Sequence, residues 1–262
     1  MSRQVLFATL VIVISTPAQA DVTIKATSTG KGLGMSGTTT AVTYIKGLKM
    51  RSEATSGKAN TATIFDVDAQ KMYVLDVKKK EADVWDMGAF TQEMSKSVAV
   101  GEVSASMKPN GQTKSIGGQN ADGYDVNIVV PATMGGPGGM PITMLLTGTS
   151  WIAKGAPGSA DYSAFYQGAA EKGWIFSDPR AAQGSPGQAK AMAQMYAEFA
   201  KIGGIPYETQ MDIKAQGEGP MAALMSRMGS VETTTTTDSV ETGSLADELF
   251  QVPADYKLKQ RQ

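Results

Sequence analysis

The chain contains no histidine and no cysteine among its 262 residues. Without these side chains, the Ser-His-Asp and Cys-His mechanisms are impossible, and so are the usual zinc and haem sites. Catalysis would depend on carboxylates, lysine, tyrosine or serine, and sequence spacing does not locate a converging pair of carboxylates. We therefore expect no enzyme activity and no cofactor, and a hydrolase with paired carboxylates ranks third among the alternatives.

A surplus of one charge is also missing, because 24 basic residues are balanced by 25 acidic ones. Nucleic-acid binding calls for a basic surplus or stripe, so we expect no nucleic-acid partner. The one long apolar run, Val5–Ile14, follows Arg3 and precedes the small residues of Ala18–Ala20. This pattern is typical of a cleaved signal peptide, and the run is too short to span a bilayer as a helix.

We therefore expect residues 1–20 to be a signal peptide and residues 21–262 to form one mature domain in the periplasm. The mature sequence has no second long apolar run, which predicts that it has no transmembrane segment. It also has no cysteine that could carry a lipid anchor or form a disulfide. A soluble monomer stabilised by its core alone is the expectation.

Short apolar segments separated by turn signals fill residues 39–85. Their apolar and polar residues alternate, as in a sheet with one dry face and one wet face. Tight links such as Lys46-Gly47 predict antiparallel hairpins. The strands expected here are 39–45, 49–54, 62–67, 71–77 and 82–85, preceded by 21–28 and followed by 102–107, 113–116, 124–130, 142–154, 206–216 and 231–241.

Apolar residues at three- and four-residue spacing predict helices over 88–99, 161–172 and 185–201, with a short helix or turn at 220–228. Helices placed between strands suit a lid on one face of an antiparallel sheet. Glycine predicts a loop or hairpin turn at 30–37, and glycine with proline predicts a loop at 131–141. The fold class expected is therefore α+β: a curved antiparallel sheet, half-closed into a barrel, with two or three helices on its concave side.

Two parts of the sequence resemble a known group of bacterial proteins. Segments 44–47 (YIKG), 49–51 (KMR), 64–66 (IFD) and 72–76 (MYVLD) resemble an uncharacterised periplasmic family related to the lipoprotein-carrier superfamily of LolA, LolB and LppX. Segment 250–257 (FQVPADYK) is similar to the closing strand of such proteins, with Asp255 in place of the usual glycine. The resemblance implies a LolA-like half-barrel under a helical lid with a hydrophobic ligand between them, and it carries over no ligand-binding residue.

Methionine is the compositional anomaly, with 16 residues in the chain. Its flexible thioether suits the lining of a hydrophobic pocket, although filling of the core is the alternative for each single methionine. Together with the resemblance, this favours a non-catalytic periplasmic protein that binds a lipid or other hydrophobic small molecule in a half-barrel cavity. The residues expected to line the cavity are Tyr44, Phe65, Tyr73, Leu75, Trp151, Met192, Met195 and Phe199.

Two other functions stay open at this point. An envelope structural or protein-interaction module without a ligand would contact a protein partner through a sheet edge or the 131–141 loop. Copper(I) binding would use thioethers, because soft sulfur ligands select this ion. The thioethers at suitable spacing belong to Met192 and Met195, and to Met225 and Met228 with Met221 nearby.

Two charged segments are best explained as turns. Residues 66–70 begin like a calcium loop but lack its later glycine and glutamate, so we expect a hairpin turn and no metal site. Residues 78–81 (KKKE) predict a solvated turn, with contact to anionic lipid headgroups as the alternative.

Overall fold

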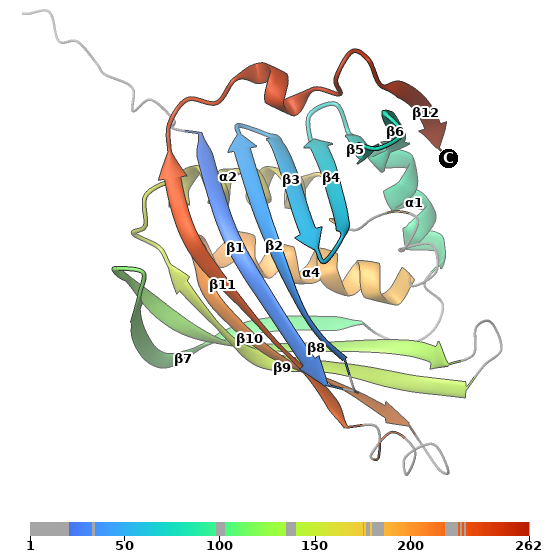
Figure 1. Cartoon of the computed structure of the whole chain (residues 1–262). Helices are drawn as coiled ribbons and strands as arrows, with labels where there is room; N and C mark the ends of the chain where they lie inside the picture. The colour runs from blue at the N-terminus through green and yellow to red at the C-terminus, as the bar shows by residue number, and fades with distance from the viewer. Residues whose placement is uncertain are drawn as a thin grey trace, which may run out of the picture.

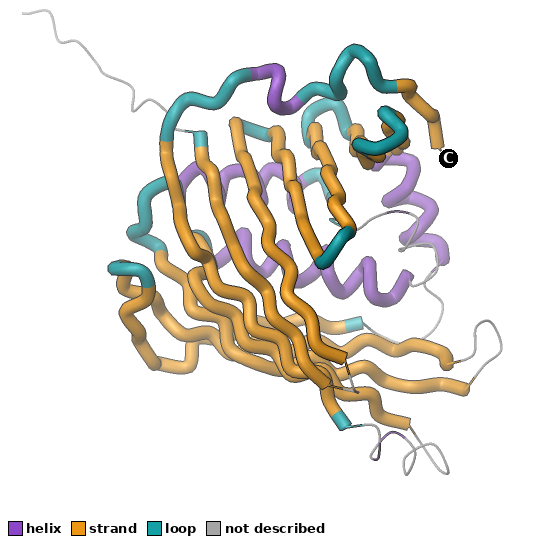
Figure 2. The backbone as a smooth tube through the Cα atoms, viewed as in Figure 1, coloured by secondary structure: helices purple, strands orange, loops and turns teal. Residues whose placement is uncertain are grey.

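The structure is a computed structural model that describes residues 21–32, 35–97, 103–134, 140–174, 176, 179, 186–217, 225, 227 and 229–261. One strongly curved sheet dominates it, with helices inside the curve (Figure 1). The smooth backbone trace shows the same arrangement of strand and helix (Figure 2). The predicted signal peptide at 1–20 lies outside the described residues, as does most of the predicted short helix at 220–228.

Twelve strands of the described chain form this sheet, in the order β12-β6-β5-β4-β3-β2-β1-β11-β10-β9-β8-β7. β12 and β7 are its two edges, so the sheet is unclosed. All neighbours are antiparallel except β12, which runs parallel to β6. The strands are β1 (Val22–Gly32), β2 (Met35–Lys46), β3 (Lys49–Ser56), β4 (Ala59–Asp66), β5 (Lys71–Asp76), β6 (Glu81–Asp86), β7 (Ser104–Ile116), β8 (Gln119–Met134), β9 (Met140–Ala153), β10 (Ile205–Gly217), β11 (Ser230–Thr242) and β12 (Lys257–Arg261).

The predicted meander of hairpins is confirmed from β2 to β6. Gly47 and Gly57 stand at two of the hairpin tips with φ of 55° and 58°, a left-handed conformation that glycine adopts without a Cβ clash. The turn between β4 and β5 is the one expected at 66–70. There the Asp66 carboxylate accepts a hydrogen bond of 2.9 Å from the backbone N–H of Ala69.

Three helices are described: α1 (Met87–Ser97), α2 (Ser159–Glu171) and α4 (Pro186–Ile202). They confirm the helices predicted at 88–99, 161–172 and 185–201, and with them the α+β class. α2 contacts β2 and β10, α4 contacts β7 and β8, and α1 contacts β6 (Figure 1). Among the described residues, no helix has the length and apolar character needed to cross a membrane.

Two predicted loops are shorter than expected. At 30–37, β1 and β2 pair as a hairpin, as the turn alternative predicts, but β1 continues to Gly32 and β2 begins at Met35, so strand occupies most of this range. β8 and β9 likewise extend into 131–141, where Pro131 lies opposite Thr143. The prediction that proline excludes a ladder here is wrong. In the described residues, β8 pairs with β7 only up to Val129, and β9 pairs with β10 only from Ile142. Pro131 and Pro141 thus have a described ladder partner on one side only, where a missing N–H is tolerated.

The C-terminal segment crosses the sheet on the face opposite the helices. The closing strand expected at 250–257 is not found there, because 247–250 form a 3₁₀ helix (η1, Asp247–Phe250) and strand begins only at Lys257. Lys80 and Asp255 form an ion pair of 2.7 Å that fixes the segment to the β5–β6 turn. Val252 and Tyr256 of this segment pack on an apolar cluster made of Ala62, Ile64, Tyr73, Leu75 and Ala82.

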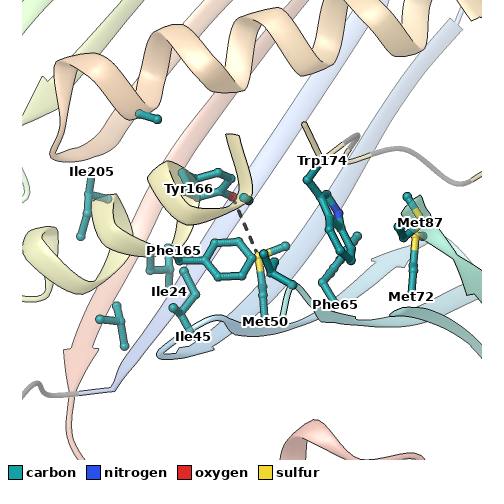
Figure 3. Packing of buried hydrophobic residues seen from close by; sticks show 14 of the residues in the cluster. Ile24, Ile45, Met50, Phe65, Met72, Met87, Phe165, Tyr166, Trp174 and Ile205 are labelled. Atoms are coloured by element: carbon teal, nitrogen blue, oxygen red, sulfur yellow. Dashed lines mark hydrogen bonds between the residues drawn. The ribbon is translucent and has the colours of Figure 1, made fainter. Parts of the chain in front are cut away.

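We call the side of the sheet that faces α2 and α4 the inner face, and the other side the outer face. Two apolar clusters fill much of the inner side. The first cluster joins β1–β6 to the helices, and Figure 3 shows Phe165 close to Ile24, Ile45 and Met50, with Trp174 beside Phe65. The second cluster joins β7–β9 to α4, and its buried members are Val103, Met107, Tyr124, Val126, Ile128, Val130, Ile152 and Ala191.

Gly148 in β9 lies where β9 and β10 approach each other closely. A Cβ atom there would lie 1.9 Å from the backbone oxygen of Gln210 in β10. Because two paired strands relieve such a clash only by moving apart, we expect Gly148→Ala to lower the free energy of unfolding by about 2 kcal/mol or more. Urea unfolding followed by circular dichroism measures this. Gly37→Ala is the control, since nothing lies within 4 Å of its Cβ position, and an equal effect of both changes would contradict the prediction.

Candidate functional site

The inner face of β1–β4 changes from large to small side chains along the strands. The row formed by Ile45, Met50 and Phe65 belongs to the first cluster. The next two rows across β2, β3 and β4 carry Thr43, Ser52 and Thr63, and then Ala41, Ala54 and Thr61. Apart from Thr61, which is exposed, these residues are half-buried. The sheet itself therefore fills little of the space in front of these rows.

Residues of helix α4 that are three or four positions apart lie on the same side of the helix, because each turn contains about 3.6 residues. Two such stripes of α4 pack against the two clusters. Met192 lies between the stripes and is half-buried, while Lys190 and Lys201 lie on the far side of the helix and are exposed. The first cluster lies on the wing of the sheet formed by β1–β6 and the second on the wing formed by β7–β10, so the arc around Met192 lies between the contacts with the two wings. The first stripe comprises Ala189, Ala193, Tyr196 and Ala200, and the second Ala191, Met195, Phe199 and Ile202.

An open hollow of about 380 Å³ continues the small-residue face at the far ends of β1, β2 and β11. Gly30 and Gly37 lie opposite each other there, and no atom lies within 4 Å of the Cβ position at Gly37. The hollow thus arises because side chains are missing at these positions. Ser28, Thr39, Val231 and Thr233 also line it, and a second hollow of about 520 Å³ adjoins at the ends of β10 and β11.

Aromatic rings fill the opposite end of the inner side. Tyr196 of α4 stacks on Tyr166 of α2 at 5.3 Å between ring centroids, and Phe176 contacts both rings. The Tyr166 hydroxyl donates a hydrogen bond to the Met50 sulfur at 3.9 Å (Figure 3). Burial raises the pKa of Tyr162, Tyr166 and Tyr196. This end is therefore packed and neutral, and the small-residue end is where the inner side is open.

Four of the residues predicted to line a cavity lie on the helix side of the sheet. Phe65 is buried in the first cluster, where its ring lies 5.6 Å from that of Phe176. Met195 and Phe199 pack against the second cluster, and Met192 lies on the arc between the clusters. The structure brings the three α4 residues together on one helix.

Tyr44, Tyr73 and Leu75 lie on the outer face, because each is one residue out of phase with an inner neighbour. Trp151 is also out of phase with Ser150, but it packs against the first cluster. Tyr44 is opposite Arg51, and Tyr73 and Leu75 belong to the cluster under the C-terminal segment. Trp151 lies with the Lys114 ammonium 5.5 Å from its ring centroid. The structure therefore does not bring these four residues together with Met192.

Sequence reasoning missed the small residues that leave the inner side open. It searched for large apolar side chains, whereas the relevant positions are Ala26, Ala41, Gly30 and Gly37. A signal for them exists in the sequence, since Gly, Ala, Ser and Thr recur at every second residue of 26–30 and 37–43.

The described residues do not gather three or more acidic side chains in a way that could hold a metal ion. For copper, Met192 and Met195 lie on neighbouring arcs of α4, and Met221 and Met228 lie outside the described residues. Copper binding therefore stays a prediction.

One pair of carboxylates lies close enough to interact. Burial raises the pKa of Asp161, and the negative charge of Asp21 adds to this shift. Asp21, however, accepts a hydrogen bond of 2.7 Å from the backbone N–H of Leu245 and lies 3.7 Å from the Lys46 ammonium. The pair thus has a structural explanation, because Asp21 ties the C-terminal segment to the start of β1.

No family model and no curated protein matches the chain. Among solved structures it is similar to a DUF1329 family protein from Desulfovibrio piger, with 8% identity, a TM-score of 0.29, and 90% of this chain and 91% of that chain covered. A putative outer membrane lipoprotein-sorting protein domain from Vibrio parahaemolyticus gives 6% identity, a TM-score of 0.29, and coverage of 89% and 90%. PNGF-II gives 9% identity, a TM-score of 0.27, and coverage of 92% and 31%.

The buried tyrosines predict loss of stability at high pH. Burial raises the pKa of Tyr162, Tyr166 and Tyr196 above the usual value of 10.0. The unfolded chain then ionises at a pH where the folded protein does not, so stability that is fully present below pH 10 falls as the pH rises further. Tyrosinate absorbance and circular dichroism, recorded together in one alkaline titration, should change together for these residues.

Tyr196→Phe is the control for this titration. It removes one ionising group without removing the ring, and we expect the unfolding midpoint to move to higher pH. Complete ionisation of tyrosine before any loss of the circular dichroism signal would contradict the prediction.

Proposed function

We propose that this chain is a non-catalytic periplasmic protein that binds a lipid or other hydrophobic small molecule inside a LolA-like half-barrel. The ligand would lie between helix α4 and the inner face of the central strands, with the helices as the lid. One observation carries the proposal: β2 and β3 present a half-buried inner face of small residues around Ala41 and Ala54, on the same side of the sheet as the half-buried arc of α4 around Met192.

The energetics favour an apolar occupant. Each methylene group that leaves water contributes about 0.8 kcal/mol, so an alkyl chain of about ten carbons gains roughly 8 kcal/mol before the costs of immobilisation. Thioether side chains adapt to such a chain at little cost, since methionine has three rotatable bonds. The signal peptide expected at 1–20 supports the periplasmic location.

Filling the small-residue face tests the proposal. We expect Ala41→Leu to weaken binding of the apolar dye N-phenylnaphthylamine by about tenfold or more, which corresponds to about 1.4 kcal/mol. The added side chain would occupy the volume in which the dye lies, while a half-buried strand position accepts leucine. Dye fluorescence measures the affinity, and thermal unfolding verifies that the fold is kept.

Thr40→Leu is the matched control, because the neighbouring residue of β2 points to the outer face and is exposed. Equal dye affinity for the wild-type protein and Ala41→Leu would contradict the proposed site. A wild-type protein that binds no dye would contradict ligand binding itself and would favour the envelope-interaction alternative.

A further inference from the structure

The charged side chains of the central strands lie on the outer face. Lys25 pairs with Glu241 at 3.1 Å across β1 and β11, and Lys114 pairs with Glu208 at 2.8 Å. The register of β1–β4, β10 and β11 gives the inner positions, which in the described residues are Gly, Ala, Ser, Thr and apolar residues only. A ligand on the inner face thus meets no charged group from these strands.

A row of hydroxyl groups crosses this inner face. In register across β2, β1, β11, β10 and β9, each strand places a serine or threonine opposite the next. The row consists of Thr39, Ser28, Thr235, Thr209 and Ser150, and it continues to Ser56 in β3 and Tyr124 in β8. The Lys154 ammonium lies 5.6 Å from the Tyr124 ring centroid, so the Tyr124 end is not part of the uncharged surface. Seven neighbouring strands therefore contribute a hydroxyl at the same level.

The hydroxyl row has free hydrogen-bonding capacity. Ser28 and Thr235 share a hydrogen bond of 2.8 Å, and so do Ser150 and Thr209. Each hydroxyl has one donor and two acceptor positions, so within each pair one O–H and several lone pairs are not used by the pair itself. Ser150 is fully buried, whereas Thr39, Ser28, Thr235 and Thr209 are half-buried. These four hydroxyls can both donate to and accept from a polar group that carries no charge.

Large apolar residues adjoin the row on one wing of the sheet. Met211 and Leu146 lie on the inner side of β10 and β9 and pack with Met195 and Phe199 of α4 around the second cluster. A ligand that spans both surfaces would place a polar head at the hydroxyls and an alkyl chain toward these side chains. An ionic head would lose its hydration at the row without gaining an opposite charge.

We propose, on the basis of the proposed function above, that the ligand is an uncharged amphiphile whose head group carries hydroxyl or ester oxygens that bind the hydroxyl row. The hydroxyl row selects against carboxylate and ammonium head groups, and the apolar side chains beside the row bind the alkyl chain of the ligand.

Three compounds that share a lauryl chain test this selection: monolaurin, laurate and lauryltrimethylammonium. In displacement of N-phenylnaphthylamine from the periplasmic protein at neutral pH, we expect monolaurin to bind about tenfold more tightly, or more, than either ion. Equal or tighter binding of an ion would overturn the head-group assignment and leave the proposed function intact. Failure of the dye and all three compounds to bind would overturn both.

Removing single hydroxyls tests the row directly. We expect Thr235→Val to weaken monolaurin binding about threefold or more, because one hydrogen bond is lost while the shape is kept. Dye binding should not change, which separates a head-group contact from a structural role, and Thr235→Ser should restore the affinity. Thr236→Val is the matched control, since this residue lies opposite Thr27 on the outer face. Equal effects of the two valine variants would overturn the proposal.

Discussion

The pairing of β1 with β11 joins the two wings of the sheet, and the rest of the molecule depends on its register. β1 is the first described strand and β11 lies more than two hundred residues later, so this contact connects the meander of β2–β6 with the hairpins of β7–β10. The register shifts between Lys25 and Ala26, where β11 contains the extra residue Asp238. Thr27 donates a hydrogen bond of 2.7 Å to the Asp238 carboxylate at this bulge.

The bulge decides which threonines of β11 face inward. Because one residue is inserted, Val240 and Thr237 both lie on the inner face although they are an odd number of residues apart. Thr235 then falls opposite Ser28, and Thr236 points outward. Without the bulge, the β11 residues on one side of Asp238 would point to the opposite face of the sheet, since a slip of one residue exchanges the faces of a strand. The hydroxyl row and the position of α4 both follow from this register.

Helix α4 couples the two wings a second time. Its two stripes pack against the first and second clusters, and the half-buried Met192 lies on the arc between them. The aromatic rings of α2 and α4 close one end of the inner side, while glycines opposite each other in β1 and β2 open the other end. A curved sheet with one packed end and one open end is a suitable container for an elongated molecule with two unlike ends.

The sequence alone was sufficient for the α+β class, for the meander of β2–β6 and for all three described helices, because these depend on local periodicity and turn residues. It was not sufficient for the inward side of each strand. Alternation defines two faces but not which one meets the helices, so Tyr44, Tyr73 and Leu75 were expected inside and lie outside. Five consecutive threonines at 233–237 do not indicate which of them face inward. The bulge at Asp238 decides this, and local periodicity gives no signal for the bulge. The site therefore depends on pairings between distant strands.

Native mass spectrometry tests the central claim most directly. The full chain, with residues 1–20 retained, would be expressed and purified from the periplasmic fraction without detergent, and extracted with organic solvent to recover any bound compound. The account predicts a complex of one protein with one lipid-sized molecule, and an extracted compound that carries no ionic head group. A bare protein mass that stays unchanged after incubation with vesicles containing neutral lipids would contradict it.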